Sequence, residues 1–296
     1  MSAWTGRLAR RRRAGGRQGV LALLLLPAAA WYLVFLLAPL VVLAVVSFGV
    51  RAPNGGYIPG LSLDQYLGLS TRLTAVANTL ALGFLGTVGC LLVAYPLAYV
   101  LATRGGSWKT VLMAFIVIPL WTSFLIRTYA WMFILGSNGI PRLLGQLGFG
   151  EIQLLNTPFA VVLGIVYNYL PLMALPIYVS LERLDRSLLE ASRDLGAGSL
   201  ATFRQVTLPL SAPGVISGCL LVFIPVMGEY LIPVLLGGGK TYFLGNALAD
   251  LFLQSRNWPF GSALATSFVV VMVIVVGIYS WATRRLSSPG REGSLL

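Results

Sequence analysis

The sequence predicts an all-α membrane protein with six transmembrane helices and both termini in the cytoplasm. Three observations support this fold class. The chain of 296 residues is 57% hydrophobic and only 10% charged, whereas soluble domains carry about 25% charged residues. Six apolar runs are each long enough to cross a bilayer core, which takes about 20 helical residues. Lys and Arg residues gather in alternate connections between these runs, as the positive-inside rule requires.

The six apolar segments are predicted to be helices, because irregular backbone is not tolerated against lipid. They lie at about 20–48, 75–102, 110–135, 158–181, 213–236 and 262–282. Several contain prolines, at which we expect kinks whose freed carbonyls are satisfied by neighbouring helices. These prolines are Pro27, Pro39, Pro96, Pro119, Pro171, Pro176 and Pro225.

The start of the first segment also resembles a secretory signal peptide. An Arg-rich stretch precedes a short apolar run, and residues 28–30 offer a small-residue cleavage pattern. The apolar sequence nevertheless continues unbroken to Phe48, which favours an uncleaved first span over the signal peptide.

The positive charges predict the orientation of the chain. With the N-terminus inside, 15 of the 21 Lys and Arg residues fall on the cytoplasmic side and 5 on the other, while Arg127 lies within a span. The chain then divides into a basic, lipid-binding cytoplasmic segment (1–19), a transmembrane domain (20–282) and a cytoplasmic tail (283–296). Membrane orientation explains the net charge of +12, so no nucleic-acid partner is predicted.

The cytoplasmic loop 182–212 has the pattern of a helix–turn–helix. Read as a helix, residues 181–195 carry one apolar face, formed by Leu181, Leu184, Leu188 and Leu195. Gly196 and Gly198 are expected to end this helix, and Ser199 to cap a second one that stops at Pro209. The pattern alone leaves two destinations open for the apolar face: the chain's own surface or lipid, and a partner protein.

The spacing within this loop resembles the EAA loop of the permease subunits of bacterial ABC importers. That motif reads Glu-Ala-Ala, three residues, Gly, nine residues, then Ile-x-Leu-Pro. Here Glu190-Ala191-Ser192 is followed at the same spacing by Gly196, and nine residues later by the tetrapeptide Val206 to Pro209. The departures, Ser192 for Ala and Val206 for Ile, are both small.

The resemblance implies a type I ABC importer permease fold and a coupling helix that docks on an ATP-binding subunit. The residues carried over are Glu190, Ala191, Ser192, Asp194, Gly196, Ala197, Leu200, Phe203, Leu208 and Pro209. Leu200 and Phe203 are expected to anchor in a groove of the ATPase, Glu190 to meet a basic group, and Gly196 to form the turn.

The same resemblance implies the partners and the absence of enzymatic chemistry on this chain. Two copies of an ATP-binding subunit would bind ATP and Mg, so no cofactor or metal is expected here. A second, unlike permease that forms a heterodimer with this chain and an extracytoplasmic substrate-binding protein would complete the complex. The location would be the bacterial inner membrane.

Further stretches, such as "IPLWTSFLIRTYAW" and "RNWPFGSA", resemble the spermidine/putrescine permease group. This resemblance implies a polyamine cargo. Relatives that carry iron, thiamine or opine-like compounds share parts of these stretches, so another small solute is the alternative. A stand-alone secondary transporter would leave the loop unexplained, and the absence of His argues against a membrane enzyme.

Glu229 is the only acidic residue inside a predicted span, which makes it a candidate for the substrate path. A polyamine is a polycation, so aromatic faces near a carboxylate would suit it; the candidates are Tyr230, Trp121, Tyr129 and Tyr167. The alternative is structural, since Arg127 is predicted at a similar depth in the outer third of the bilayer. Arg127 and Glu229 could then pair with each other or extend to the interface.

Other polar positions have less specific expectations. Interhelical hydrogen bonding is favoured over lining of the path for Asn78, Thr79, Asn168 and Tyr169. A short apolar stretch at 244–253, which contains Asp250, is expected to be either a packed loop or an external helix that contacts the binding protein.

Overall fold

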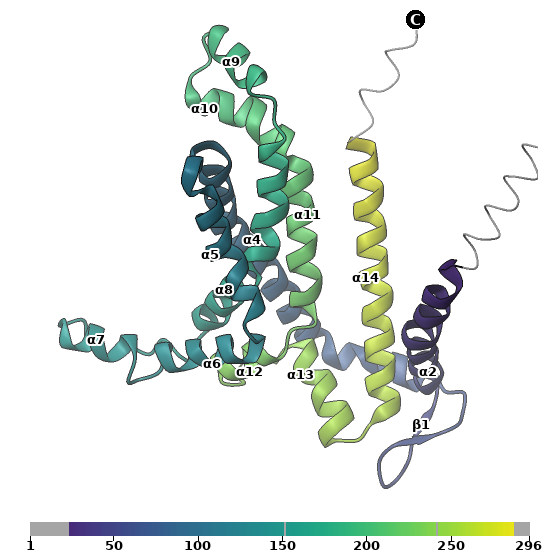
Figure 1. Cartoon of the computed structure of the whole chain (residues 1–296). Helices are drawn as coiled ribbons and strands as arrows, with labels where there is room; N and C mark the ends of the chain where they lie inside the picture. The colour runs from purple at the N-terminus through teal and green to yellow at the C-terminus, as the bar shows by residue number, and fades with distance from the viewer. Residues whose placement is uncertain (1–23, 151, 241, 287–296) are drawn as a thin grey trace, which may run out of the picture. The chain divides into compact units, whose positions relative to one another are not determined.

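The computed structural model describes residues 24–286 except 151 and 241 (Figure 1). The predicted N-terminal segment 1–19, the first residues of the first span and the tail from 287 lie outside the described residues. Five helices in the described part are long and apolar enough to cross a membrane, and a bent helix pair makes a possible sixth. The predicted helical, multi-span fold class is therefore confirmed.

The described residues fall into two compact units. The first contains residues 24–69 and 251–271. Its first span runs over Leu24–Val46 and includes a π-helical turn (Leu33–Leu37) and α2 (Ala38–Val46). Two short strands, β1 (Val50–Arg51) and β2 (Tyr57–Ile58), pair antiparallel, which is a small departure from the all-α prediction. Helix α3 (Asp64–Leu67) and the first half of α14 (Trp258–Leu286) also belong here.

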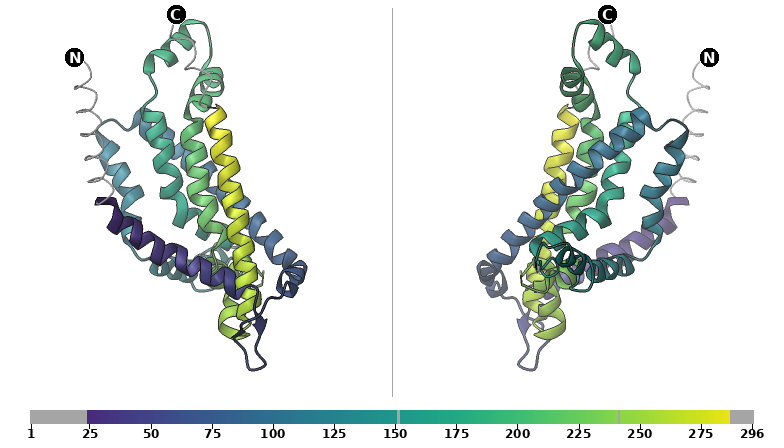
Figure 2. Two further views of the ribbon diagram at one scale, coloured as in Figure 1. Left: turned by 90° about the vertical axis from the view of Figure 1, so that its right-hand side faces the viewer. Right: turned by 90° about the vertical axis from the view of Figure 1, so that its left-hand side faces the viewer.

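The second unit, residues 70–250 and 272–286, carries the sites discussed below. Its core is formed by three long helices that pack on one another: α4 (Leu73–Arg104), α8 (Pro158–Glu182) and α11 (Leu208–Met227). The shorter elements are α5 (Lys109–Trp121), α6 (Phe124–Leu135), α7 (Ile140–Gln146), α9 (Arg186–Asp194), α10 (Ser199–Thr202), α12 (Leu231–Gly237) and α13 (Leu244–Ala249). Figures 1 and 2 place α9 and α10 at one end of the core and α12 and α13 at the other.

Short helical turns join several of these elements. Two 3-10 turns cover Gly68–Arg72 and Gly106–Trp108. Besides the π-helical turn in the first span, two more cover Phe203–Thr207 and Asp250–Gln254. The third span differs from prediction at the break between α5 and α6, and the fifth at a π-helical turn and at the break before α12.

The third predicted span, 110–135, is not one straight helix. Helices α5 and α6 are bent by 100° at the break between Trp121 and Phe124, where Thr122 and Ser123 have extended backbone. Pro119 lies just before the break. A kink was expected there, but the helix ends and the chain changes direction. The predicted depth of Arg127 assumed a straight helix, which α5 and α6 do not form.

The fifth predicted span, 213–236, is also displaced. A continuous helical run extends over Ser199–Met227, and α12 is a separate helix after Gly228 and Glu229. Pro209, which was predicted to stop the loop helix, lies inside this run. The π-helical turn ends immediately before α11, and there the Leu208 N–H bonds the Phe203 carbonyl. The missing N–H of Pro209 therefore falls where the hydrogen-bond register has already shifted.

Glycines allow α8 and α11 to approach closely. A Cβ placed on Gly214 would lie 2.4 Å from the Ser180 Cβ and 2.6 Å from the Pro176 carbonyl oxygen. A Cβ on Gly218 would lie 2.8 Å from the Met173 sulfur. A Cβ on Gly214 would meet the backbone carbonyl of Pro176, which cannot move aside by a side-chain rotation.

Gly214→Ala is expected to destabilise the protein by about 1–3 kcal/mol, the usual cost of overpacking. The matched control is Gly277→Ala on α14, because a Cβ there would meet nothing within 4 Å. The measurement is the thermal denaturation of both variants in detergent. Equal melting temperatures would contradict a close α8–α11 contact at Gly214.

Candidate coupling loop and translocation path

The loop helix α9 begins at an acidic cap. The carboxylate of Asp185 accepts a hydrogen bond from the backbone N–H of Ser187, at 3.0 Å. This bond favours the charged carboxylate and holds the pKa of Asp185 below its usual range. Because the pKa of Asp185 is lower in the folded state, the cap stabilises the helix at pH values above the unfolded-state pKa. This stabilisation is lost as the pH falls through the folded-state pKa.

The predicted loop helix 181–195 is in fact two helices. Helix α8 ends at Glu182 and α9 starts at Arg186, so Leu181 is buried in the core and Leu184 packs against it. The prediction placed both on one helical face with Leu188 and Leu195, which is wrong. The large apolar residues left exposed between 183 and 205 are Leu188, Leu195 and Leu200, at 47%, 89% and 70%.

The turn after α9 is built on a left-handed glycine. Gly196 has φ +83°, and a side chain on it would point into open space. The N–H of Gly196 bonds the Arg193 carbonyl at 2.9 Å, and the N–H of Ala197 bonds the Ser192 carbonyl at 3.1 Å. These bonds satisfy the carbonyls at the end of α9, as a glycine-terminated helix requires.

The second helix of the loop starts without the predicted cap. Gly198 precedes α10 and gives no side-chain cap, whereas Ser199 is the first helical residue. A different serine stabilises the loop instead, because the hydroxyl of Ser192 lies 3.1 Å from that of buried Thr202. The departure from the family's Ala at position 192 therefore links α9 to α10.

Phe203 lies against its own chain. Its ring makes edge-to-face contacts with Tyr95 and Tyr99 of α4, at centroid distances of 5.7 and 5.8 Å. The Tyr95 hydroxyl in turn lies 2.9 Å from that of Ser211 on α11. Phe203 thus attaches the base of the loop to the core. Of the two predicted anchors, only Leu200 is exposed.

The remaining predicted loop residues lie at the surface. Ala197 is half-buried, and the exposed ones are Glu190, Ala191, Asp194, Leu208 and Pro209.

Glu229 lies in the break between α11 and α12, at the opposite end of the core from the loop. Its carboxylate accepts hydrogen bonds from the Tyr169 hydroxyl at 2.8 Å and from the backbone N–H groups of Leu231 and Ile232, at 2.9 and 3.3 Å. It therefore caps α12 and ties that helix to α8. The side chain remains partly exposed.

Arg127 does not form the predicted ion pair with Glu229. The side chain is only 9% exposed, so it does not extend to the interface either. Within the described residues its Nε and one terminal nitrogen have no hydrogen-bond partner, and its guanidinium lies over the Phe124 ring, 5.9 Å from the ring centroid. The reason is the break in the third span, which gives α6 a direction that the sequence did not indicate.

Within the described residues, the predicted aromatic candidates form no hydrogen bond to the Glu229 carboxylate. Tyr167 instead contacts the ring of Trp131, at 5.4 Å, and the others present exposed faces; these are Trp121, Tyr129 and Tyr230. The aromatic partner of Glu229 is Tyr169, which was expected only to hydrogen-bond between helices. Its position two residues after Tyr167 could not by itself indicate which of the two faces Glu229.

Two other polar residues link α4 to the segment after α12. The Asn78 side chain donates to the Tyr242 carbonyl at 3.0 Å, and the Thr79 hydroxyl accepts from the Leu244 N–H at 2.7 Å. Asn78, Thr79 and Tyr169 therefore form hydrogen bonds to other elements, as expected. Asn168 differs, because it donates to Gly164 within its own helix.

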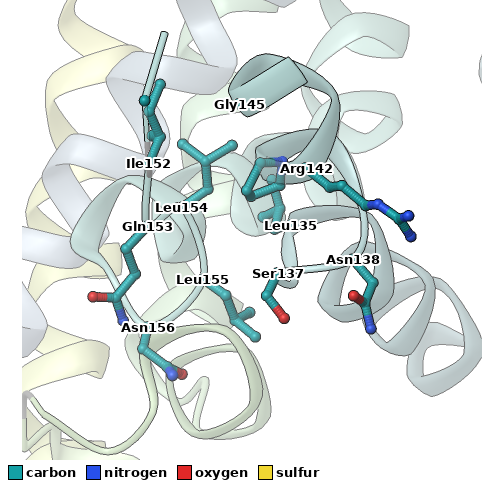
Figure 3. A pocket seen from close by; sticks show the side chains of 12 residues that line it. Leu135, Ser137, Asn138, Arg142, Gly145, Ile152, Gln153, Leu154, Leu155 and Asn156 are labelled. Atoms are coloured by element: carbon teal, nitrogen blue, oxygen red, sulfur yellow. The ribbon is translucent and has the colours of Figure 1, made fainter. Parts of the chain in front are cut away.

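A cavity of about 990 Å³ lies between the α6–α7 region and residues 152–156 (Figure 3). Its described lining includes Ser137, Asn138, Arg142 and Gln153, and none of the described lining residues is acidic. It is therefore a poorer candidate for a cation than the Glu229 segment.

Comparison with known proteins identifies relatives over most of the chain. Residues 94–288 match the family described as "Binding-protein-dependent transport system inner membrane component". The spermidine/putrescine transport system permease protein PotB of Haemophilus influenzae is 40% identical over 87% of this chain and 92% of its own length. The protein of the same name from Escherichia coli is 36% identical, over 87% and 95%.

Solved structures show the same fold at lower identity. A subunit of a bacterial ABC transporter that imports the polysaccharide alginate matches with a TM-score of 0.75 at 18% identity, over 94% of this chain and 99% of that one. The methionine ABC transporter MetNI matches with a TM-score of 0.52 at 21% identity, over 75% and 95%.

Proposed function

The chain belongs to the family of binding-protein-dependent transport system inner membrane components, and from this premise we propose that it is the permease subunit of an ATP-driven polyamine importer. The observation that carries the proposal is the identity of 36–40% with spermidine/putrescine permeases over nearly the whole chain. The protein is a multi-pass component of the inner membrane. ATP and Mg would bind to a separate ATPase subunit.

The loop supplies the contact through which the ATPase would act. An exposed turn at Gly196 lies between two exposed apolar residues, Leu195 and Leu200. Burial of such residues in a groove of a partner would be favourable. Glu190 is exposed on α9 and is suited to a charge-assisted contact with a basic group of the ATPase.

The helix that leaves the loop provides a direct mechanical connection to the opposite end of the core. The run Ser199–Met227 has 29 residues, which at 1.5 Å per residue spans about 43 Å. Glu229 follows two residues after its end. A displacement of the docked loop would therefore be transmitted along one helix to the Glu229 segment, where Tyr169 and α12 are attached.

Glu229 is the proposed substrate contact in the path. Its carboxylate would attract an ammonium group, and the exposed faces of Trp121, Tyr129, Tyr167 and Tyr230 are available for cation–π attraction elsewhere along the path. Two copies of the ATPase, a second, unlike permease and an extracytoplasmic binding protein would complete the complex. The predicted orientation, with the loop and both termini in the cytoplasm, places Glu229 toward the external side.

The test is uptake of labelled putrescine and spermidine by cells that lack polyamine importers. The cells would express this chain with its ATPase, second permease and binding protein, and a control would carry an ATPase unable to hydrolyse ATP. ATP-dependent uptake of either polyamine is expected. A complex that assembles and hydrolyses ATP but takes up no polyamine would require a different small solute as cargo.

A further inference from the structure

The segment 242–250 packs over the end of the core that holds Glu229. Leu244 and Ala247 of α13 are almost completely buried, at 2% and 0% exposed. The segment is attached to the start of α4 by the bonds from Asn78 to the Tyr242 carbonyl and from the Leu244 N–H to Thr79. It is therefore packed, but as a helix and not as the loop of one expectation; contact with the binding protein, the other expectation, stays a prediction.

Helix α13 lies directly against the backbone that carries Glu229. A Cβ on Gly245 would lie 2.8 Å from the Tyr230 Cβ, 3.0 Å from the Glu229 carbonyl oxygen and 3.1 Å from that of Gly228. Such an approach is possible only because Gly245 has no side chain. Movement of α13 would consequently uncover the Glu229 segment.

Three polar side chains join the two ends of this element. The Tyr242 hydroxyl donates to the Asp250 carboxylate at 2.7 Å, and the Arg72 guanidinium lies beside Tyr242, 5.8 Å from its ring centroid. Burial and the Asp250 carboxylate raise the pKa of Tyr242 to about 12, against the opposite influence of Arg72. The tyrosine therefore stays protonated and keeps donating to Asp250 at any physiological pH.

We propose that residues 242–250 form an external closure over the Glu229 segment, with Arg72, Tyr242 and Asp250 as its clasp. An ammonium group of the substrate opens the clasp by displacing Arg72 from beside Tyr242 and by pairing with the Asp250 carboxylate. The opening ligand rests on the proposed function, because it assumes an organic cation as cargo. The closure itself does not depend on which solute is carried.

The chemistry of the clasp fits such an exchange. A carboxylate beside an aromatic ring is an environment that attracts organic cations, and Arg72 is a cation already present there. Arg72 is covalently attached to the start of α4, whereas a substrate amine can bind and dissociate. Replacement of one by the other would remove one of the contacts between the start of α4 and the 242–250 segment, and would leave Asp250 with a cation beside it.

The first test loosens the clasp with two mild variants, Tyr242→Phe and Asp250→Asn. The readout is ATP hydrolysis by the whole complex without the binding protein, a measurement that needs no substrate. A loosened closure favours the externally open state, so we expect a rise of about tenfold, the effect of one lost hydrogen bond to a charged group. Asp64→Asn is the matched control, because Asp64 is an exposed acid whose partner is the nearby Ser62 hydroxyl.

The second test locks the closure with Thr79→Cys and Leu244→Cys, in a background of Cys90→Ala and Cys219→Ala. Oxidation should stop uptake and stimulation of the ATPase by the binding protein, and a reductant should restore both. If the unlocked complex carries no polyamine, the proposed cargo fails, while the ATPase response still reports on the closure. Unchanged ATP hydrolysis in both loosened variants, or full activity in the cross-linked protein, would overturn the proposal.

Discussion

Gly196→Val is expected to abolish uptake, while Gly196→Asn should retain most of it. Position 196 has φ +83°, a conformation that a β-branched residue rarely adopts and that Asn tolerates. The left-handed geometry costs roughly 1–2 kcal/mol for ordinary residues, so the turn would rearrange and misplace Leu195 and Leu200. The measurement is uptake together with the amount of ATPase that copurifies.

The same substitution two residues further on separates backbone strain from simple bulk. Gly198 has φ −68°, and a Cβ there meets nothing within 4 Å. Gly198→Val is therefore expected to keep more uptake than Gly196→Val. Equal losses in the two valine variants would mean that the left-handed turn is not what the loop requires.

Glu229→Gln is expected to lower uptake by about 10- to 100-fold, the effect of removing a charge from a hydrogen-bonded site. The amide oxygen of Gln can still accept from the N–H groups of Leu231 and Ile232, so α12 should remain capped and the complex should assemble. The measurement is the concentration dependence of uptake, with assembly checked by copurification.

Tyr169→Phe is the matched control for Glu229. It removes the hydroxyl that donates to the carboxylate but leaves the charge in place, so its effect on uptake should be smaller. If Glu229→Gln transports with unchanged kinetics, the carboxylate only caps α12 and is not a substrate contact.

Most of the long helices and the turn of the candidate coupling loop were accessible from the sequence, for different reasons. Long apolar runs have few structural alternatives in a membrane, so the predicted segments 75–102, 158–181 and 262–282 agree closely with helices of the structure. The loop was recognisable because Glu190, Gly196 and Pro209 stand at fixed spacing. Gly196 indeed adopts the left-handed conformation that a turn glycine is expected to have.

The helix breaks were not accessible, because apolar sequence does not distinguish a kink from a change of direction. Kinks were expected at all of the prolines within the predicted spans. Pro171 and Pro176 lie within the continuous α8, whereas Pro119 is followed by a bend of 100°. The pairing of Arg127 with Glu229 was inferred from depth along straight helices and failed at these breaks. The contact of Phe203 with Tyr95 and Tyr99 depends on tertiary packing between residues about a hundred positions apart.

The central claim is that the exposed loop docks on an ATPase subunit, and cross-linking tests it most directly. A photoreactive residue would replace Leu200 on the loop in the assembled complex, with controls at Phe203, which packs on its own chain, and at Lys240, near the opposite end of the core. We predict a strong cross-link to the ATPase from position 200, a weaker one from 203 and none from 240. The absence of any cross-link from position 200 in a complex that hydrolyses ATP would contradict the claim.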